Sequence, residues 1–218
     1  MKEFSFSTID DFDNHINSSI FGYTLLDALI TSIVDFIVKQ EGTIVDLGCT
    51  SGRLLHTLKK QLDATNRKCD YFGYDITDHN FQYENCYKAD ITSPQFIIPK
   101  ADVILSVFTL QFLSYKDREE LLRKIYTSLK PGGCFIFCEK EFCQSGKIQE
   151  IFTFSNYEKK MKNFSATEIL EKEKTLRKIM QNLTSRQNIG MLYSAGFNTD
   201  ETSIFFKSLA FTGYLCLK

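Results

Sequence analysis

Tryptophan is absent from this chain of 218 residues, and proline (3) and histidine (3) are scarce. The seven cysteines include no CxxC pair, and no histidine lies beside a pair of cysteines. Because a zinc site needs closely spaced ligands of this kind, we expect no metal centre. An odd number of cysteines without a CxxC pair indicates reduced thiols. Cys134 and Cys138 fit the small apolar positions of a strand.

Neither sign of charge dominates. Lys+Arg 26 against Asp+Glu 27 give a net charge of -1 and a pI near 6.3. A protein that binds many phosphates is normally basic, so we do not expect direct nucleic-acid binding. A local patch at Lys159, Lys160 and Lys162 keeps that alternative open, and a solvated helix face is the simpler interpretation.

Long apolar runs are also missing. A membrane-spanning helix needs about 20 consecutive apolar residues, and no segment approaches this length. The first residues, "MKEFSFSTIDDFDNH", carry acids where a signal peptide has an apolar core. We therefore expect a cytoplasmic protein without a membrane segment.

Two kinds of segment alternate over the first two thirds of the chain. Apolar residues recur at helical spacing in residues 24–39, 52–64 and 114–130. Short apolar runs that predict strands occupy residues 43–48, 70–76, 101–110 and 131–140. This alternation predicts an α/β fold with a doubly wound, mostly parallel sheet, in which ligands bind at the carboxyl ends of the strands.

The last third has a different pattern. Residues of about 144–196 are largely helical, with one charged helix predicted over 166–180. Residues 203–208 and 211–218 then read as two closing strands, predicted to form a hairpin at the sheet edge. With no repeat, linker or low-complexity run, we expect one domain over residues 1–218 with a helical insertion at about 144–196.

A loop of small residues follows the first predicted strand in "TIVDLGCTSGRLL". Asp46 stands near the end of that strand, and Gly48, Thr50 and Gly52 follow at alternate positions. Glycines there allow close backbone approach to a ligand and leave helix amides free to donate. The dinucleotide pattern GxGxxG is not met, which disfavours NAD. The loop resembles that of class I S-adenosylmethionine (SAM) methyltransferases; a tight turn without a ligand is the alternative.

Two further acids follow later strands. Asp75 ends the second predicted strand, where a carboxylate can accept both ribose hydroxyls; a capping role is the alternative. Asp90 and Ile91 lie in "KADITS", where an acid near the adenine amino group and an apolar cover for the ring are expected of this fold. Asp90 capping the turn before Pro94 is an equally simple interpretation.

Several motifs occur together and in order, and they resemble the CmoA-like carboxy-S-adenosylmethionine synthase family. They are "FGYTLL", "VDLGCTSG", "FTLQFL", "LLRKIYTSLKPGG", "CEKEF", "EILEKEKTLRKIM" and "SAGF". The resemblance runs from about Phe12 to Lys218. It implies a SAM-type α/β domain, commonly a homodimer, that converts SAM and prephenate into carboxy-SAM for tRNA wobble-uridine modification by a partner enzyme.

The resemblance also implies a set of cofactor contacts. These are Tyr23, the loop Gly48-Cys49-Thr50, Asp75-Ile76 and Asp90-Ile91. Tyr23 would offer its hydroxyl and ring near the amino-acid end of SAM; a core tyrosine with a satisfied hydroxyl is the alternative.

Two matched positions depart from the family pattern. Glu173 stands where the family carries an arginine that contacts the carboxylate of carboxy-SAM, and Val107 replaces an asparagine beside the cofactor. The guanidinium of an arginine binds a ligand carboxylate by two charged hydrogen bonds, whereas the carboxylate of a glutamate repels a ligand carboxylate. Lys172, Lys174 or Arg177 could compensate from a neighbouring turn, but this is disfavoured because adjacent helical residues point in different directions. Glu173 is therefore a substrate-pocket candidate that would attract a sulfonium or an amine.

Because of these two departures, we predict a SAM-dependent transferase that uses ordinary SAM to methylate an unknown small-molecule acceptor. The sequence shows no catalytic acid or base by spacing, so positioning would do most of the catalysis. Carboxy-SAM synthesis from SAM and prephenate is one alternative, and a catalytically silent SAM-binding subunit is another. The expected ligand is SAM or a derivative such as S-adenosylhomocysteine or carboxy-SAM.

Overall fold

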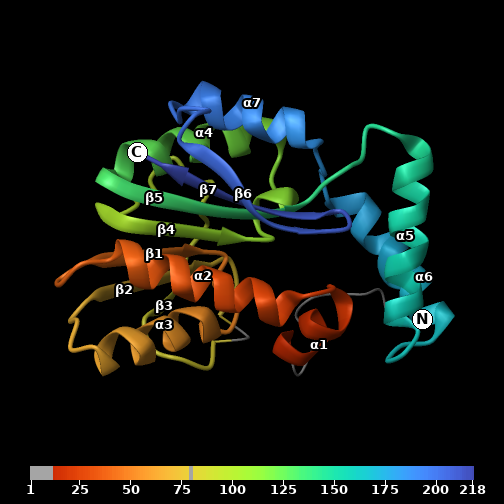
Figure 1. Ribbon diagram of the computed structural model, residues 1–218, viewed down its shortest axis with the longest axis horizontal. Coiled ribbons are helices and arrows are strands. Elements are labelled where there is room, and N and C mark those ends of the chain that lie inside the picture. Colours follow the sequence, from red (N-terminus) through yellow and green to blue (C-terminus); the bar gives the residue numbers. More distant parts are fainter. Residues whose placement is uncertain (1–11, 79–80) are drawn as a thin grey trace.

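The computed structural model describes residues 12–78 and 81–218. The expectation drawn from the acids of residues 1–11 therefore lies outside the described part of the chain. One seven-stranded sheet forms the centre of the molecule (Figure 1), with the strand order β3-β2-β1-β4-β5-β7-β6. Its strands are β1 (Thr43–Leu47), β2 (Asp70–Asp75), β3 (Cys86–Lys88), β4 (Ala101–Val107), β5 (Leu129–Lys140), β6 (Thr202–Ser208) and β7 (Phe211–Leu217).

Strands β1 to β5 pair in parallel, and β7 runs antiparallel to both β5 and β6. The predicted doubly wound, mostly parallel sheet with a C-terminal hairpin is thereby confirmed. The helices that accompany it are α1 (Phe12–Ser19), α2 (Tyr23–Ile37), α3 (Arg53–Ala64), α4 (Tyr115–Ser128), α5 (Gly146–Lys160), α6 (Ala166–Ile179) and α7 (Ser185–Ala195), with a 3-10 turn η2 (Leu110–Phe112).

The helices cover the two faces of the sheet separately. Helices α2 and α3 pack on one face and α4 and α7 on the other (Figure 1), and each face has its own apolar cluster. Leu26, Ile30 and Val34 of α2 are fully buried. Burial of such a side chain contributes about 2 kcal/mol, more than the ~1 kcal/mol of a helix cap. Packing therefore holds α2 in place, because its N-cap Gly22 makes no side-chain cap.

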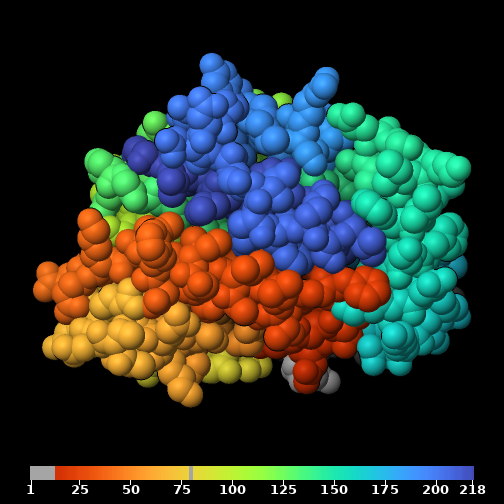
Figure 2. Space-filling view, in the orientation of Figure 1, coloured from red at the N-terminus to blue at the C-terminus, as the bar shows by residue number. Residues whose placement is uncertain are grey.

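Helices α5 and α6 stand apart from the faces, beyond the carboxyl end of β5 (Figure 1). Together with α7 they fall within the helical region expected at about 144–196. In the space-filling view α1 lies against this helical pair (Figure 2), and Lys159 Nζ donates to the carbonyl oxygen of Asn17 at 3.1 Å. Helices α5 and α6 thus close one end of the sheet, whereas α7 covers a face together with α4.

Two elements were not anticipated from the sequence. Strand β3 has three half-buried or exposed residues and so carries no apolar pattern. Helix α1 is only 8 residues long. Within the described ranges, no single helix is long and apolar enough to cross a membrane; α1 and α2 meet that test only as a pair bent by 111°.

Candidate cofactor site

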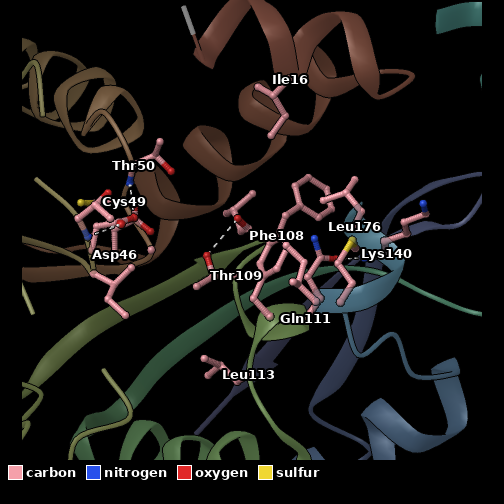
Figure 3. A pocket seen from close by; sticks show the side chains of 18 of the residues that line it. Ile16, Asp46, Cys49, Thr50, Phe108, Thr109, Gln111, Leu113, Lys140 and Leu176 are labelled. Carbon is pink, nitrogen blue, oxygen red and sulfur yellow. Dashed lines mark hydrogen bonds between the residues drawn. The ribbon is translucent and has the colours of Figure 1, made fainter. Parts of the chain in front are cut away.

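A cavity of about 710 Å³ lies at the carboxyl ends of the parallel strands, with α1 on one side and α6 at its far end (Figure 3). This is the position where open α/β sheets bind ligands. Nearly all the residues predicted for the site line this cavity. They are Tyr23, Asp46, Gly48, Cys49, Thr50, Asp75, Ile76, Asp90, Ile91, Val107 and Glu173.

Gly52 is the predicted site residue that does not line the cavity. It caps the N-terminus of α3 with φ 83°. A Cβ at this position would lie 2.4 Å from the sulfur of Cys86. Its small size therefore serves the turn and the packing of β3, and not close approach to a ligand.

The glycine loop is fixed from beneath by β2. The amides of Gly48 and Cys49 both donate to the carbonyl oxygen of Tyr74, at 2.7 and 3.1 Å. Gly48 has φ 88°, and a Cβ there would lie 2.1 Å from the hydroxyl oxygen of Thr109. Only glycine fits this contact, so the loop can pass close to the tip of β4.

Asp75 joins the loop to the tip of β2. Its carboxylate accepts hydrogen bonds from the amide of Thr50 at 3.0 Å and from the amide of Thr77 at 3.2 Å. A carboxylate has about four acceptor positions, so capacity remains for a ligand. The neighbouring Ile76 is 66% exposed, which leaves an apolar surface beside the carboxylate.

Asp46 is the most isolated acid of the site. It is 3% exposed, and no described residue donates a hydrogen bond to its carboxylate. Burial raises the pKa of Asp46 to about 7, with a further contribution from the negative charge of Asp75 and an opposing one from Arg53. A buried acceptor without a partner, facing a cavity, suits a cationic ligand group.

Asp90 and Ile91 follow β3. The carboxylate of Asp90 accepts hydrogen bonds from the amide and hydroxyl of Thr92, at 2.9 and 2.6 Å. These bonds hold the pKa of Asp90 below its ordinary value. Asp90 therefore caps its turn, the alternative interpretation of the sequence, while also lining the cavity next to the buried Ile91.

Tyr23 belongs to a charged cluster beside the loop. Its side chain is 7% exposed, and burial raises the pKa of its hydroxyl. Arg53 donates to Asp13 through Nε at 3.0 Å and pairs through Nη2 with Asp27 at 2.7 Å. The same Nη2 lies 3.5 Å from the Tyr23 hydroxyl. The cluster holds α1, α2 and α3 together at the cofactor-loop end of the cavity.

The opposite end of the cavity carries lysines. Glu173 accepts from Lys160 at 3.1 Å and pairs with Lys140 at 3.6 Å. Burial raises the pKa of Glu173, but the positive charges of Lys140 and Lys160 outweigh burial and hold that pKa below its ordinary value. Lys172 lines the same cavity and contacts His15 and the Ser19 hydroxyl. The sequence-based expectation that Lys172 points elsewhere is wrong, because one broad face of α6 lines the cavity and includes both Lys172 and Glu173.

Burial and the neighbouring Lys160 lower the pKa of Lys172 to about 7. Val107, the last residue of β4, also lines the cavity, and the following Phe108 has φ 58° and packs on Phe211. Sequence reasoning missed several cavity residues: Asp13, His15, Arg53, Thr109, Lys140 and Lys160. Of these, Lys140 had a usable signal, since it ends a predicted strand on the ligand-binding edge.

Within the described ranges no cluster of three His, Cys, Asp or Glu side chains has metal-binding geometry.

The strand order, the antiparallel β7 and the loop between β1 and α3 define a class I methyltransferase fold. The family model "Methyltransferase domain" matches residues 45–135. Human N-acetylserotonin methyltransferase in complex with SAM aligns with 90% of this chain and 52% of its own at 18% identity, with a TM-score of 0.61. A methyltransferase in complex with the Trm112 activator of Haloferax volcanii aligns with 89% of this chain at a TM-score of 0.58 and 14% identity.

Full-length relatives narrow the class. The carboxy-S-adenosyl-L-methionine synthase of Campylobacter fetus is 31% identical over 225 residues, which cover 99% of this chain and 94% of the relative. The synthase of Campylobacter lari is 30% identical over 99% of this chain and 94% of the relative. The synthase of Staphylococcus epidermidis is 29% identical over 97% of this chain and 94% of the relative. The chain belongs to the carboxy-S-adenosyl-L-methionine synthase family. It is a SAM-dependent transferase, as its sequence predicts, with SAM or a derivative as cofactor.

Proposed function

We propose that the cavity binds SAM with its amino-acid end at the glycine loop, its ribose on Asp75 and its adenine beside Asp90 and Ile91. The observation that carries this placement is the pair Asp46 and Asp75. The carboxylate of Asp46 has no hydrogen-bond partner among the described residues, and that of Asp75 has spare acceptor positions, on either side of a loop that only glycine can form. The first suits an ammonium group and the second suits two hydroxyls.

We further propose that the protein transfers the methyl group of ordinary SAM to a small molecule. Bound SAM supplies an electrophilic methyl group on a sulfonium centre. The chain's own residues hold the two reactants in line, which is the main requirement of a direct displacement. Glu173 supports ordinary SAM, because its carboxylate already engages Lys140 and Lys160 at the end where an anionic group on the cofactor would need a cation.

A second candidate is carboxy-SAM synthesis, the activity that the names of the relatives state. The lysine end favours it: three ammonium groups, from Lys140, Lys160 and Lys172, face one carboxylate. Three lysines against one carboxylate put positive charge in excess there, and the pKa of Lys172 is lowered first by burial and then by the charge of Lys160. An anionic substrate such as prephenate would relieve that excess.

The two candidates differ in their product. Purified protein is incubated with SAM and prephenate, and the mixture is analysed by mass spectrometry for carboxy-SAM. Ordinary methyl transfer predicts no carboxy-SAM, together with a methylated product and S-adenosylhomocysteine when a pool of small-molecule acceptors is added. Bound SAM without turnover in either assay would identify a silent SAM-binding subunit and contradict both candidates.

Domain organisation, oligomeric state and location complete the proposal. We infer a single domain over residues 1–218 that acts as a homodimer in the cytoplasm on a small molecule, without direct nucleic-acid contact. All seven cysteines lie in the described residues as free thiols, which supports a reducing compartment. Sedimentation analysis of the purified protein tests the dimer.

A further inference from the structure

Arg53 has a place in the cavity that the proposed cofactor contacts do not use. It is the first residue of α3, directly after the glycine loop, and its side chain lines the cavity. Its Nε and Nη2 engage Asp13 and Asp27. Its Nη1 makes no hydrogen bond to the described residues. One donor of a fixed guanidinium fork is therefore available at the loop end of the cavity.

Asp13 lies directly beside Arg53 and also lines the cavity. It lies in the first turn of α1, accepts from Arg53 at 3.0 Å and accepts from the hydroxyl of Ser51 at 3.2 Å. Its side chain is 26% exposed, so the carboxylate is not enclosed by these two donors. A cationic donor and an anionic acceptor thus lie side by side, and the same cavity is lined by the carboxylate of Asp46, which accepts from no described residue.

We propose that Arg53 and Asp13 recognise the zwitterionic amino-acid end of the cofactor, with Arg53 binding the α-carboxylate and Asp13, together with Asp46, accepting from the α-ammonium. The inference rests on the proposed cofactor site and adds to it two residues that the sequence did not indicate. Because Asp13 belongs to α1, a bound amino-acid end joins α1 to the glycine loop. The cluster then selects ligands that carry both charges.

Charge balance agrees with this assignment. Arg53 brings one positive charge, against negative charges on Asp13 and Asp27, so the cluster has room for a further ammonium. Asp27 is half-buried and does not line the cavity, and its carboxylate fixes the guanidinium by binding Nη2. The guanidinium is held in one orientation before a ligand arrives, which lowers the entropy cost of binding.

Two ligands that differ only at this end test the inference. S-adenosylhomocysteine carries the amino-acid group, and 5′-methylthioadenosine has the same thioether-linked adenosine without it. Calorimetry on the full chain is expected to show that the wild type binds S-adenosylhomocysteine at least about tenfold more tightly. R53Q and D13N should each weaken S-adenosylhomocysteine about 10- to 100-fold and leave 5′-methylthioadenosine within about twofold.

R67Q is the matched control. Arg67 is also a half-buried arginine, and it pairs with Asp35 and the carbonyl oxygens of Asp35 and Val38 away from the cavity. It should change neither affinity. Equal weakening of both ligands in R53Q would mean that Arg53 only supports the loop, and unchanged binding of both would mean that it touches neither; each result overturns the inference. Failure of the wild type to bind either ligand would overturn the cofactor site itself. Retained 5′-methylthioadenosine binding shows that a variant is folded.

Discussion

The carboxylate of Glu173 lies 3.1 Å from the ammonium nitrogen of Lys160, and both side chains are less than a tenth exposed. Lys160 ends α5 and Glu173 belongs to α6, while the second cation, Lys140, ends β5. The helical region is thus joined to the tip of a central strand by buried charges. A segment that a sequence presents as an insertion supplies the far wall of the cavity.

E173Q tests this joint. Removing the carboxylate leaves two ammonium groups buried without an anion, and breaking one partner of such a pair costs about 3 kcal/mol or more. Denaturant unfolding of E173Q should show that loss. E171Q, two residues earlier on the same helix and at a carboxylate with no ion pair to the described residues, should unfold like the wild type. An equal loss in both variants would refute a specific contribution from the Glu173 cluster.

Asp75 is expected to be essential for cofactor binding. D75A removes the proposed ribose acceptor and also the partner of the Thr50 amide, so SAM binding measured by calorimetry should disappear. D75N keeps an oxygen for that amide and should retain the loop while still losing most of the affinity. D70A, at the exposed start of the same strand, is the control. Unchanged SAM affinity in D75A would remove Asp75 from the site.

Glu141 makes a separate prediction about stability. This carboxylate is 2% exposed and accepts from five side chains: Ser185, Asn188, Lys207, Thr212 and Tyr214. E141Q cannot accept all five, and unsatisfied buried donors each cost about 1–3 kcal/mol. We expect a loss of about 3 kcal/mol in unfolding free energy at pH 7.

The stabilisation by Glu141 should depend on pH, in the direction that the shift of its pKa sets. Burial raises the pKa of Glu141, but the hydrogen bonds from Thr212 and Tyr214 outweigh it and hold the pKa below its ordinary value of 4.5. Its stabilisation is therefore present above pH 4.5 and lost as the pH falls through the folded-state pKa. The gap between wild type and E141Q should narrow in acid; a constant gap, or an equal loss in the exposed control E201Q, would contradict this account.

Cofactor affinity should depend on pH through Asp46. Its folded-state pKa of about 7 means that it is half protonated near neutrality, and only the ionised form attracts an ammonium. Affinity for S-adenosylhomocysteine should be about tenfold lower at pH 6 than at pH 8. D46N should bind weakly and lose that dependence. Lys172 also has a pKa of about 7, so an unchanged pH profile in D46N would assign the titration to the lysine end instead.

The sequence was sufficient for those parts of the fold that depend on local pattern. The helix expected over residues 114–130 appears as α4, capped by Ser114, whose hydroxyl accepts from the amide of Asp117 at 3.1 Å. The acids at strand tips were found because the carboxyl ends of parallel strands lie at one edge of the sheet. Strand β3 was missed because Cys86–Lys88 depends on pairing with β2, and not on its own apolar residues.

The electrostatics of the site could not be read in the same way. Whether Glu173 repels an anion depends on Lys140 and Lys160, which are distant in the sequence and meet it only when α5 and α6 pack at the end of β5. Arg53 gives no signal in the sequence, because its partner Asp13 comes from an element that the sequence did not predict. Charges across a cavity are properties of tertiary structure, and spacing along the chain does not determine them.

The most direct test of the cofactor site is a crystal structure of the protein with S-adenosylhomocysteine. The account predicts the ribose hydroxyls within hydrogen-bond distance of Asp75, the adenine against Ile91 and the ammonium against Asp46. A ligand bound elsewhere in the cavity, or one whose ribose does not contact Asp75, would contradict it.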